Sequence, residues 1–506
     1  MNLDRAACYR ALATRDARFD GRLFVAVKTT GIYCRPICPA RTPKPENCVF
    51  FASAAAAQAA GFRPCLRCRP EISPELAAWR GTSNTVQRAL ALIAEGALDG
   101  EAEGVDALAA RLGLGERQLR RLFREHLGAS PIAVAQTRRV LFAKQLLHET
   151  RLPMTEVALA AGFGSLRRFN HTFKGLFGRP PGALRRGARG AGATPAGIAL
   201  SLAYAPPYDW EAMLRFLALR AIPGVEEVAD GRYRRSIALE GSQGWIEVAR
   251  HKRRDALIAV IHGASVKALP GIVARIRRVF DLAADIGAIA AHLAQDARLK
   301  PLVAARPGLR VPGAWDGFEL AVRAILGQQI TVGAARGLAG KLVERHGRRL
   351  AVAGAPASLT HAFPTPEALA GADIAALGMP RARAAALAGL AAAVAAEPGF
   401  FGASADLDAA IARLCALNGI GAWTAQYIAM RALREPDAFP AADIGLLRAL
   451  ADADGKRPSP AELLRRAEAW RPWRAYAAIH LWASEAPPAP RPIAVMREVS
   501  DAHAAL

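Results

Sequence analysis

The sequence contains no run of about 18 uncharged apolar residues, so it predicts no helix that crosses a membrane. No secretory signal precedes its cysteines, and we therefore expect an intracellular protein with reduced thiols. Acidic residues are scarce: 44 Asp and Glu stand against 67 Lys and Arg, which gives a formal net charge of +23. Such an excess of positive charge favours a polyanionic partner. These absences exclude a membrane-spanning or disulfide-rich protein and indicate a cytoplasmic one.

Segments rich in glycine, alanine or proline divide the 506 residues into several expected domains. Residues 187–197 read GARGAGATPAG and are typical of a linker, as are residues 71–83. The segment from 486 onward is rich in proline and alanine, and we expect a flexible tail there. Positive charge is uneven, because residues 1–190 hold 30 Lys and Arg against 15 Asp and Glu.

Cysteines are few, but four of the seven form two close pairs, Cys34 with Cys38 and Cys65 with Cys68. Two short pairs on two loops can close a tetrahedral site in which four thiolates hold one zinc ion. Disulfides are the alternative. Zinc with four thiolates carries a net charge of about −2, and a zinc-bound thiolate stays deprotonated and nucleophilic. A methyl group accepted by one thiolate would remove one negative charge and weaken repulsion from DNA, which makes a chemical switch.

Basic residues surround these cysteines in the sequence, and we expect them to form a surface that meets a phosphate backbone: Arg35, Arg41, Lys44, Arg63, Arg67 and Arg69. The stretch that runs from FVAVKTTGIYCRPICPAR to GFRPCLRCRP resembles the amino-terminal zinc domain of the Ada alkylation-response proteins. The resemblance implies that Cys34, Cys38, Cys65 and Cys68 hold the zinc. It also implies that Cys34 irreversibly accepts a methyl group from a DNA methylphosphotriester, as a single-turnover methyltransferase. A purely structural zinc ribbon is the alternative.

Two helix-turn-helix patterns follow between residues 84 and 186, separated by a helix near 132–149. The second helix of each follows a glycine turn, and Ser165 can cap the later one. One face of these two helices is apolar: Leu119, Leu122 and Phe123, then Leu166, Phe169, Phe173 and Phe177. The opposite face is basic: Arg117, Arg120, Arg121 and Arg124, then Arg167, Arg168, His171 and Lys174.

Basic faces of this kind can enter successive major grooves of double-stranded DNA, although a solvated helix face is the alternative. The pattern over residues 153–181 resembles the AraC-type regulators. This resemblance implies a transcriptional activator that works with RNA polymerase. After the linker, strands near 232–240, 244–251 and 256–262 and helices near 209–219 and 267–281 predict a small α+β domain with a supporting role.

Beyond residue 282 the chain is helical, and LCALNGIGAWTAQYIAMRAL predicts a helix, a hairpin and a second helix. Gly419 and Gly421 allow the sharp turn, where backbone N–H groups can hold a phosphate. Asp443 follows, just before another helix, with Asp437 as the alternative candidate for a functional carboxylate. Together these passages resemble the helix-hairpin-helix glycosylases of the AlkA type, which excise 3-methyladenine.

The resemblance implies that Asp443 stabilises the positive sugar or orients water, and that Trp423, Tyr427 and Trp482 line the pocket for the flipped base. Core packing is the alternative for these aromatic residues. Trp423 stands where lyase relatives have a lysine, so we expect hydrolysis without strand cleavage. Gln329 stands where the family has an apolar wedge.

The sequence thus predicts a multidomain, mainly α protein, with a zinc domain at 1–80, a double helix-turn-helix domain at 84–186, an α+β domain at 198–285, a glycosylase bundle at 286–485 and a tail at 486–506. We expect a monomer in the bacterial cytoplasm, associated with the nucleoid. Its expected function is to activate alkylation-response genes and to excise alkylated bases. A regulator with a glycosylase-like half kept for DNA binding is one alternative. An enzyme that is merely anchored to DNA by its first 190 residues is another.

Overall fold

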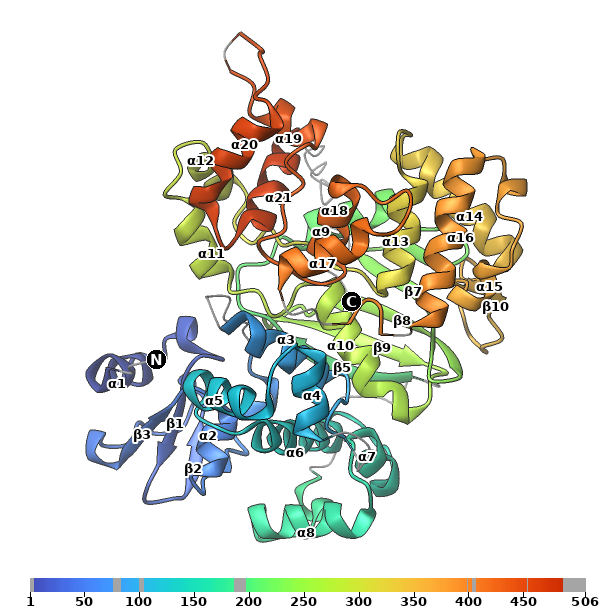
Figure 1. Ribbon diagram of the computed structural model, residues 1–506. Coiled ribbons are helices and arrows are strands. Elements are labelled where there is room, and N and C mark those ends of the chain that lie inside the picture. Colours follow the sequence, from blue (N-terminus) through green and yellow to red (C-terminus); the bar gives the residue numbers. More distant parts are fainter. Residues whose placement is uncertain are drawn as a thin grey trace, which may run out of the picture.

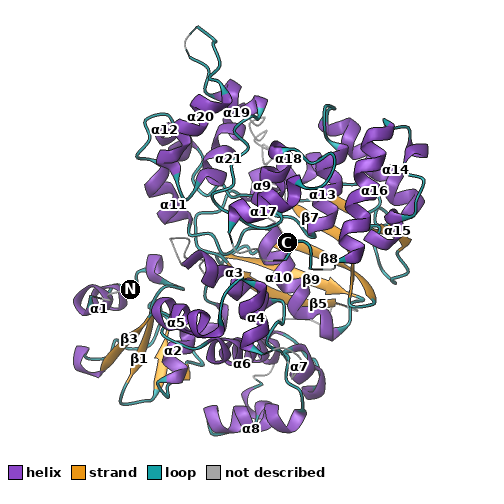
Figure 2. Cartoon of the chain, in the orientation of Figure 1, coloured by secondary structure: helices purple, strands orange, loops and turns teal. Residues whose placement is uncertain are grey.

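The computed structural model describes residues 4–75, 83–99, 104–185, 197–397, 399–402, 406–452 and 454–485. The tail predicted at 486–506 and nearly all of the linker predicted at 187–197 lie outside these residues. Within these ranges helices predominate, with three small sheets of four, two and five strands, which confirms the multidomain, mainly α prediction (Figure 2). Across the described ranges, no helix is long and apolar enough to cross a membrane.

The first sheet has the strand order β3-β1-β2-β4. Its elements are α1 (Arg5–Ala13), β1 (Phe24–Val27), β2 (Ile32–Cys34), β3 (Cys48–Phe51), α2 (Ala54–Ala59) and β4 (Arg63–Pro64). Strands β2 and β4 pair in parallel, with Tyr33 opposite Pro64. Cys34 ends β2 and Cys65 directly follows β4, so this pairing brings the two cysteine pairs together. Cys8 and Cys48 are buried.

Both helix-turn-helix units are present, and Ser165 caps the later helix by accepting a hydrogen bond from the N–H of Arg168 at 3.2 Å. The helices are α3 (Ser83–Ala94), α4 (Val105–Arg111), α5 (Glu116–Leu127), α6 (Pro131–Glu149), α7 (Met154–Ala160) and α8 (Leu166–Phe177). The predicted apolar residues of α5 and α8 are buried except Leu166, which is 39% exposed. Leu166 is the first residue of α8, where the apolar face reaches solvent.

The five-stranded antiparallel sheet has the order β5-β9-β8-β7-β6. It contains β5 (Gly197–Ala203), β6 (Glu226–Ala229), β7 (Arg232–Leu239), β8 (Ser242–Arg250) and β9 (Ala256–His262), with helices α9 (Trp210–Arg220) and α10 (Leu269–Val279). Residues of the second helix-turn-helix unit and of this sheet belong to a single hydrophobic core, which includes Phe173 of α8 and Leu202 of β5. The regulatory half and the sheet are therefore packed as one body.

The remaining helices form two groups, with α18 between them (Figure 1). They are α11 (Ile286–Leu293), α12 (Leu299–Ala305), α13 (Gly317–Leu326), α14 (Val332–His346), α15 (Pro366–Ala370), α16 (Arg381–Ala396), α17 (Leu407–Cys415), α18 (Ala422–Arg431), α19 (Ile444–Ala449), α20 (Pro460–Ala467) and α21 (Arg474–Glu485). The short strands β10 (Arg348–Arg349) and β11 (His361–Ala362) pair beside α14. Ala425 of α18 packs into the core of one group and Met430 into the core of the other.

Buried charges join α6 to the zinc loop. Lys144 of α6 is fully buried, and its ammonium group lies 2.6 Å from a Glu71 carboxylate oxygen and donates to the carbonyl of Cys65 at 3.0 Å. Burial alone would raise the pKa of Glu71, but His148, Lys144 and Arg69 lower the pKa to about 2. Arg69 also binds Glu149 at 2.9 Å. The end of α6 is thereby fixed to the loop that carries Cys65.

The same end of α6 is bonded to the five-stranded sheet. Glu149 accepts a hydrogen bond from the N–H of Ser201 in β5 at 3.0 Å, and Gln145 donates to the carbonyl of Ser201 at 2.8 Å. A buried ion pair between Arg88 of α3 and Glu435 adds a second link between the halves, at 2.7 Å. Figure 1 shows the regulatory half below the rest of the chain, with α3 and α6 next to the sheet.

We predict that Lys144→Met lowers the free energy of unfolding by about 3 kcal/mol, because it leaves the buried carboxylate of Glu71 without its closest counter-ion. The measurement is thermal unfolding followed by circular dichroism in zinc-containing buffer. Lys300→Met, which removes an exposed lysine of α12, is the matched control and should leave the melting temperature unchanged. Equal melting temperatures for the two variants would contradict the importance of this pair.

Candidate zinc centre and base pocket

The sulfur atoms of Cys34, Cys38, Cys65 and Cys68 all lie within 4.8 Å of one another. A tetrahedron with zinc–sulfur bonds of about 2.3 Å has edges of about 3.8 Å, so the four sulfurs need move little to hold one zinc ion. The backbone N–H of Arg35 donates to the sulfur of Cys68, and that of Arg67 to the sulfur of Cys65, each at 3.3 Å. Hydrogen bonds of this kind offset the negative charge of metal-bound thiolates. The donor set therefore fits one zinc ion.

Accessibility distinguishes Cys34 from the other three ligands. Cys38, Cys65 and Cys68 are buried, whereas Cys34 is partly exposed at the end of β2. Cys34 is thus the one residue of the four with partly exposed surface, although the cluster of sulfur atoms is buried.

The expected basic surface around this centre is smaller than the sequence suggested. Arg35 is buried, forms an ion pair with Asp20 and donates to the carbonyl of Cys68 at 3.2 Å. Arg69 forms ion pairs with Glu71 and Glu149. These two arginines hold the loop together, because Asp20 fixes Arg35 while Glu71 and Glu149 fix Arg69. Three others are exposed and can meet DNA: Arg41, Lys44 and Arg67.

The basic faces of α5 and α8 are open. Arg120 is half-buried and bonds to Glu116 at 2.8 Å. The other predicted contact residues are exposed: Arg117, Arg121, Arg124, Arg167, Arg168, His171 and Lys174.

A cavity of about 650 Å³ lies between α9, α13, α18 and α21, and the three predicted aromatic residues all line it. Trp423 and Tyr427 of α18 stack with their ring planes 7° apart and their centroids 5.4 Å apart. Trp482 of α21 meets the ring of Tyr427 edge-on at 6.4 Å. The structure therefore places these side chains on a cavity wall and not only in the core.

Asp443 lines the same cavity and is the N-cap of α19. One carboxylate oxygen accepts hydrogen bonds from the N–H of Gly445 at 2.9 Å and of Leu446 at 3.1 Å. The same oxygen accepts the indole N–H of Trp482 at 2.8 Å, and the other oxygen accepts that of Trp423 at 2.9 Å. Four donors thus fix the carboxylate in one orientation. The two indole bonds were not expected from the sequence, which predicted Trp423 and Trp482 only as ring surfaces.

Asp437, the alternative candidate for the functional carboxylate, forms ion pairs outside the cavity. It binds Arg474 at 2.7 and 3.0 Å and also pairs with Arg471, and it is not among the residues that line the cavity.

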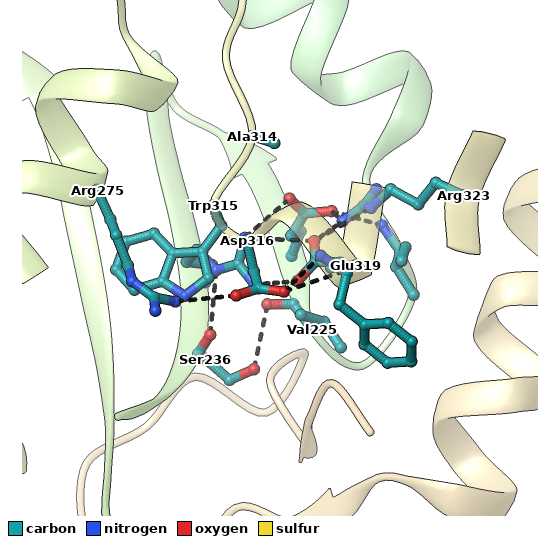
Figure 3. Close-up of polar contacts among 12 residues, drawn as sticks. Val225, Ser236, Arg275, Ala314, Trp315, Asp316, Glu319 and Arg323 are labelled. Carbon is teal, nitrogen blue, oxygen red and sulfur yellow. Dashed lines mark hydrogen bonds and ion pairs between the residues drawn. The ribbon is translucent and has the colours of Figure 1, made fainter. Parts of the chain in front are cut away.

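One wall of the cavity contains paired acidic and basic side chains that the sequence did not predict. Figure 3 shows Glu319 and Arg323 of α13 bonded to each other, beside Trp315 and Asp316. Arg235 of β7 binds Glu319 at 2.8 Å. Burial alone would raise the pKa of Glu319, but Arg235 and Arg323 lower it to about 2, so the glutamate stays ionised.

Arg431 places another cation behind the aromatic wall. It donates to the hydroxyl of Tyr427 at 2.5 Å and lies 5.3 Å over the ring of that residue. Burial raises the pKa of Tyr427, but the guanidinium groups of Arg431 and Arg220 bring it below its usual value. The cavity is therefore lined by side chains of both charges, with Asp443 bonded to the indole groups and Arg431 bonded to Tyr427.

The glycine hairpin and the turn that carries Gln329 lie side by side. Gly419 has a φ of +85°, and a Cβ there would lie 2.5 Å from the Cβ of Ala386, so only glycine fits. The side chain of Gln328 donates to the carbonyl of Gly419 at 2.8 Å. Gly421 is the N-cap of α18, and Gln329 is exposed.

Four regions of the chain each match a known protein family. Residues 7–71 match the metal binding domain of Ada, residues 108–187 a helix-turn-helix domain, residues 199–316 the AlkA N-terminal domain and residues 322–475 the HhH-GPD superfamily of base excision DNA repair proteins.

Whole-chain relatives agree with this order. A Mycobacterium tuberculosis protein named "Probable bifunctional transcriptional activator/DNA repair enzyme AlkA" is 42% identical over 486 residues, which cover 95% of this chain and 97% of that protein. DNA-3-methyladenine glycosylase 2 of Escherichia coli is 38% identical over 56% of this chain and 97% of its own length. The solved 3-methyladenine DNA glycosylase of Archaeoglobus fulgidus, 23% identical, covers 56% of this chain and 97% of its own with a TM-score of 0.50, and shares the fold.

We predict that the purified wild-type protein contains one zinc ion per chain and that Cys68→Ala loses most of it, because one of four thiolates is gone. Elemental analysis after dialysis against a weak chelator measures this. Cys415→Ala removes an exposed cysteine at the end of α17 and should keep one zinc ion. Full zinc content in Cys68→Ala would show that the metal lies elsewhere.

Proposed function

Because the chain belongs to the family of bifunctional transcriptional activators and DNA repair enzymes that contain an Ada-type zinc domain and an AlkA-type glycosylase, we propose how its sites act. It senses methylated DNA phosphates through Cys34, activates alkylation-response genes and excises alkylated bases such as 3-methyladenine. The glycosylase activity is carried by one observation: the Asp443 carboxylate, held by two indole N–H groups, lines an aromatic cavity large enough for a base. We assign the zinc domain to residues 1–80, the regulator to 84–186, the α+β domain to 198–285 and the glycosylase bundle to 286–485.

Excision begins when the damaged base leaves the duplex and enters the cavity. The stacked rings of Trp423 and Tyr427 offer an electron-rich face to an N-alkylated purine, which carries positive charge. As the bond between the sugar and the base breaks, the sugar becomes cationic, and the negative charge of Asp443 stabilises it. Water then adds to the sugar carbon, its proton passes to the departing base or solvent, and an abasic site remains. Because no lysine occupies position 423, the strand stays intact.

Methyl transfer uses the exposed edge of the zinc centre. The sulfur of Cys34 attacks the methyl carbon of a methylphosphotriester, a sulfur–carbon bond forms, and the carbon–oxygen bond breaks so that a phosphodiester anion leaves. Bound zinc supplies the chemistry that keeps this thiol deprotonated. The transfer therefore removes one negative charge from the zinc centre and restores one to the DNA phosphate. We infer that the basic faces of α5 and α8 then hold promoter DNA in a monomeric, nucleoid-associated complex that recruits RNA polymerase.

We predict that Asp443→Asn slows release of methylated purines from DNA by about 10²- to 10³-fold, because the transition state loses its compensating charge. Asparagine is also a good helix N-cap, so the fold should persist. The measurement is single-turnover base release. Asp408→Asn, which changes an exposed carboxylate on α17, is the matched control and should match wild type. Equal rates for Asp443→Asn and wild type would instead favour a regulator that keeps this half for DNA binding.

We predict that exposure to DNA containing methylphosphotriesters adds one methyl group to Cys34 and to no other cysteine. Peptide mass spectrometry locates the modification. The Cys415→Ala variant should be methylated as wild type is, whereas Cys34→Ala should gain no methyl group. A protein that excises bases but never gains this methyl group would be an enzyme anchored to DNA by its first half.

A further inference from the structure

Helix α3 of the regulatory half contacts the glycosylase half at two points. Arg88 pairs with Glu435 at 2.7 Å, and Glu95, which directly follows α3, lies 3.1 Å from Arg278 of α10. The N–H of Glu95 still bonds to the carbonyl of Ala91, as in the helix, so Arg88 and Glu95 stand about two helical turns apart on one face. The Arg88 pair is buried, whereas the side chain of Glu95 is 44% exposed.

The first contact reaches the segment that joins α18 to Asp443. The N–H of Glu435 donates to the carbonyl of Ala429 in α18 at 3.0 Å, and the carbonyl of Glu435 accepts the N–H of Ala438 at 3.2 Å. The segment is therefore folded around Glu435. Arg88 holds its carboxylate from the regulatory half, so the path of the chain between the aromatic helix and Asp443 depends on α3.

The second contact reaches the wall of the base cavity. Arg278 donates to the carbonyl of Ala314 at 3.1 Å and to that of Trp315 at 2.8 Å, and both residues line the cavity. The N–H of Ala314 donates to the carbonyl of Arg431 at 3.0 Å, and Arg431 donates to the hydroxyl of Tyr427 at 2.5 Å. A continuous series of hydrogen bonds thus runs from Glu95 to the aromatic wall.

We propose that α3 positions Tyr427 and Asp443 for base excision, so that the regulatory half takes part in the reaction without touching the substrate. Arg88 is the main positioning residue, because its ion pair is buried, whereas a half-exposed pair such as that of Glu95 contributes little. Helix α3 lies outside residues 199–316 and 322–475, which match the glycosylase families. The inference rests on the proposed glycosylase activity and gives the regulatory half a part in it.

The expected size of the effect follows from the geometry of the reaction. The damaged base lies against Tyr427 while the sugar faces Asp443, so the two residues must keep a fixed separation. A displacement of about 1 Å can slow a reaction by about 10²-fold. Loss of the α3 contact lets the segment around Glu435 shift by a smaller amount, and we therefore expect excision about tenfold slower.

The test separates the loss of a contact from the burial of an unpaired charge. Arg88→Met alone leaves the carboxylate of Glu435 buried without a partner, which destabilises the fold. The double variant Arg88→Met with Glu435→Gln removes both charges and should melt close to the wild-type temperature. Single-turnover release of 3-methyladenine at saturating DNA should be about tenfold slower in this double variant. Its affinity for the same duplex should equal that of the wild type, because both substituted residues are buried.

Arg22→Met is the matched control. Arg22 pairs with Asp285 and so also joins the two halves, but Asp285 does not line the cavity. This variant should release the base at the wild-type rate.

A wild-type rate in the double variant, or an equal loss of rate in Arg22→Met, would overturn the inference alone. So would a slower rate that is matched by an equal loss of affinity for DNA. A wild-type protein that releases no base would overturn the proposed function, and the inference with it.

Discussion

The ammonium group of Lys144 has no contact with water, so its counter-ion, Glu71, must remain beside it. That requirement fixes α6 against the loop that carries Cys65, because the lysine also binds the carbonyl of that ligand. The same helix ends at Glu149, which holds the backbone of Ser201 in the five-stranded sheet. Zinc loop, regulator and sheet are therefore held by one helix. Removing either charge would leave the other buried and uncompensated, which is why this contact constrains so much of the molecule.

Charges of both signs line the base cavity. Asp443 accepts the two indole N–H groups, whereas Arg431 and Arg220 lower the pKa of Tyr427. A cationic base has its lowest energy with its charge close to the Asp443 carboxylate and away from those guanidinium groups. Arg235 and Arg323 form ion pairs with Glu226 and Glu319, and these two positive and two negative charges cancel at long range while they hold this wall of the cavity together. The cavity thus orients a substrate by charge and holds it by ring surface.

Local patterns in the sequence predicted much of this. The short spacing within the two cysteine pairs, Cys34 with Cys38 and Cys65 with Cys68, predicted the zinc centre, and the position of Asp443 before a helix followed from the residues around it. Long-range contacts could not be predicted in this way. The indole bonds join Asp443 to residues 20 and 39 positions away. The sequence predicted Arg35 as a surface cation. In the structure Arg35 is buried and bonded to Asp20, which lies 15 residues away in the sequence.

The shared core of α8 and β5 has a geometrical consequence. When a flexible linker joins a DNA-binding domain to an enzyme, the enzyme can reach a long stretch of neighbouring DNA. Here α8 shares a core with the sheet and helix that supply part of the cavity wall, so α8 and the cavity keep a fixed orientation relative to each other. A molecule bound to its promoter through α8 therefore presents its cavity to one face of the duplex, and that face recurs about every 10.5 base pairs.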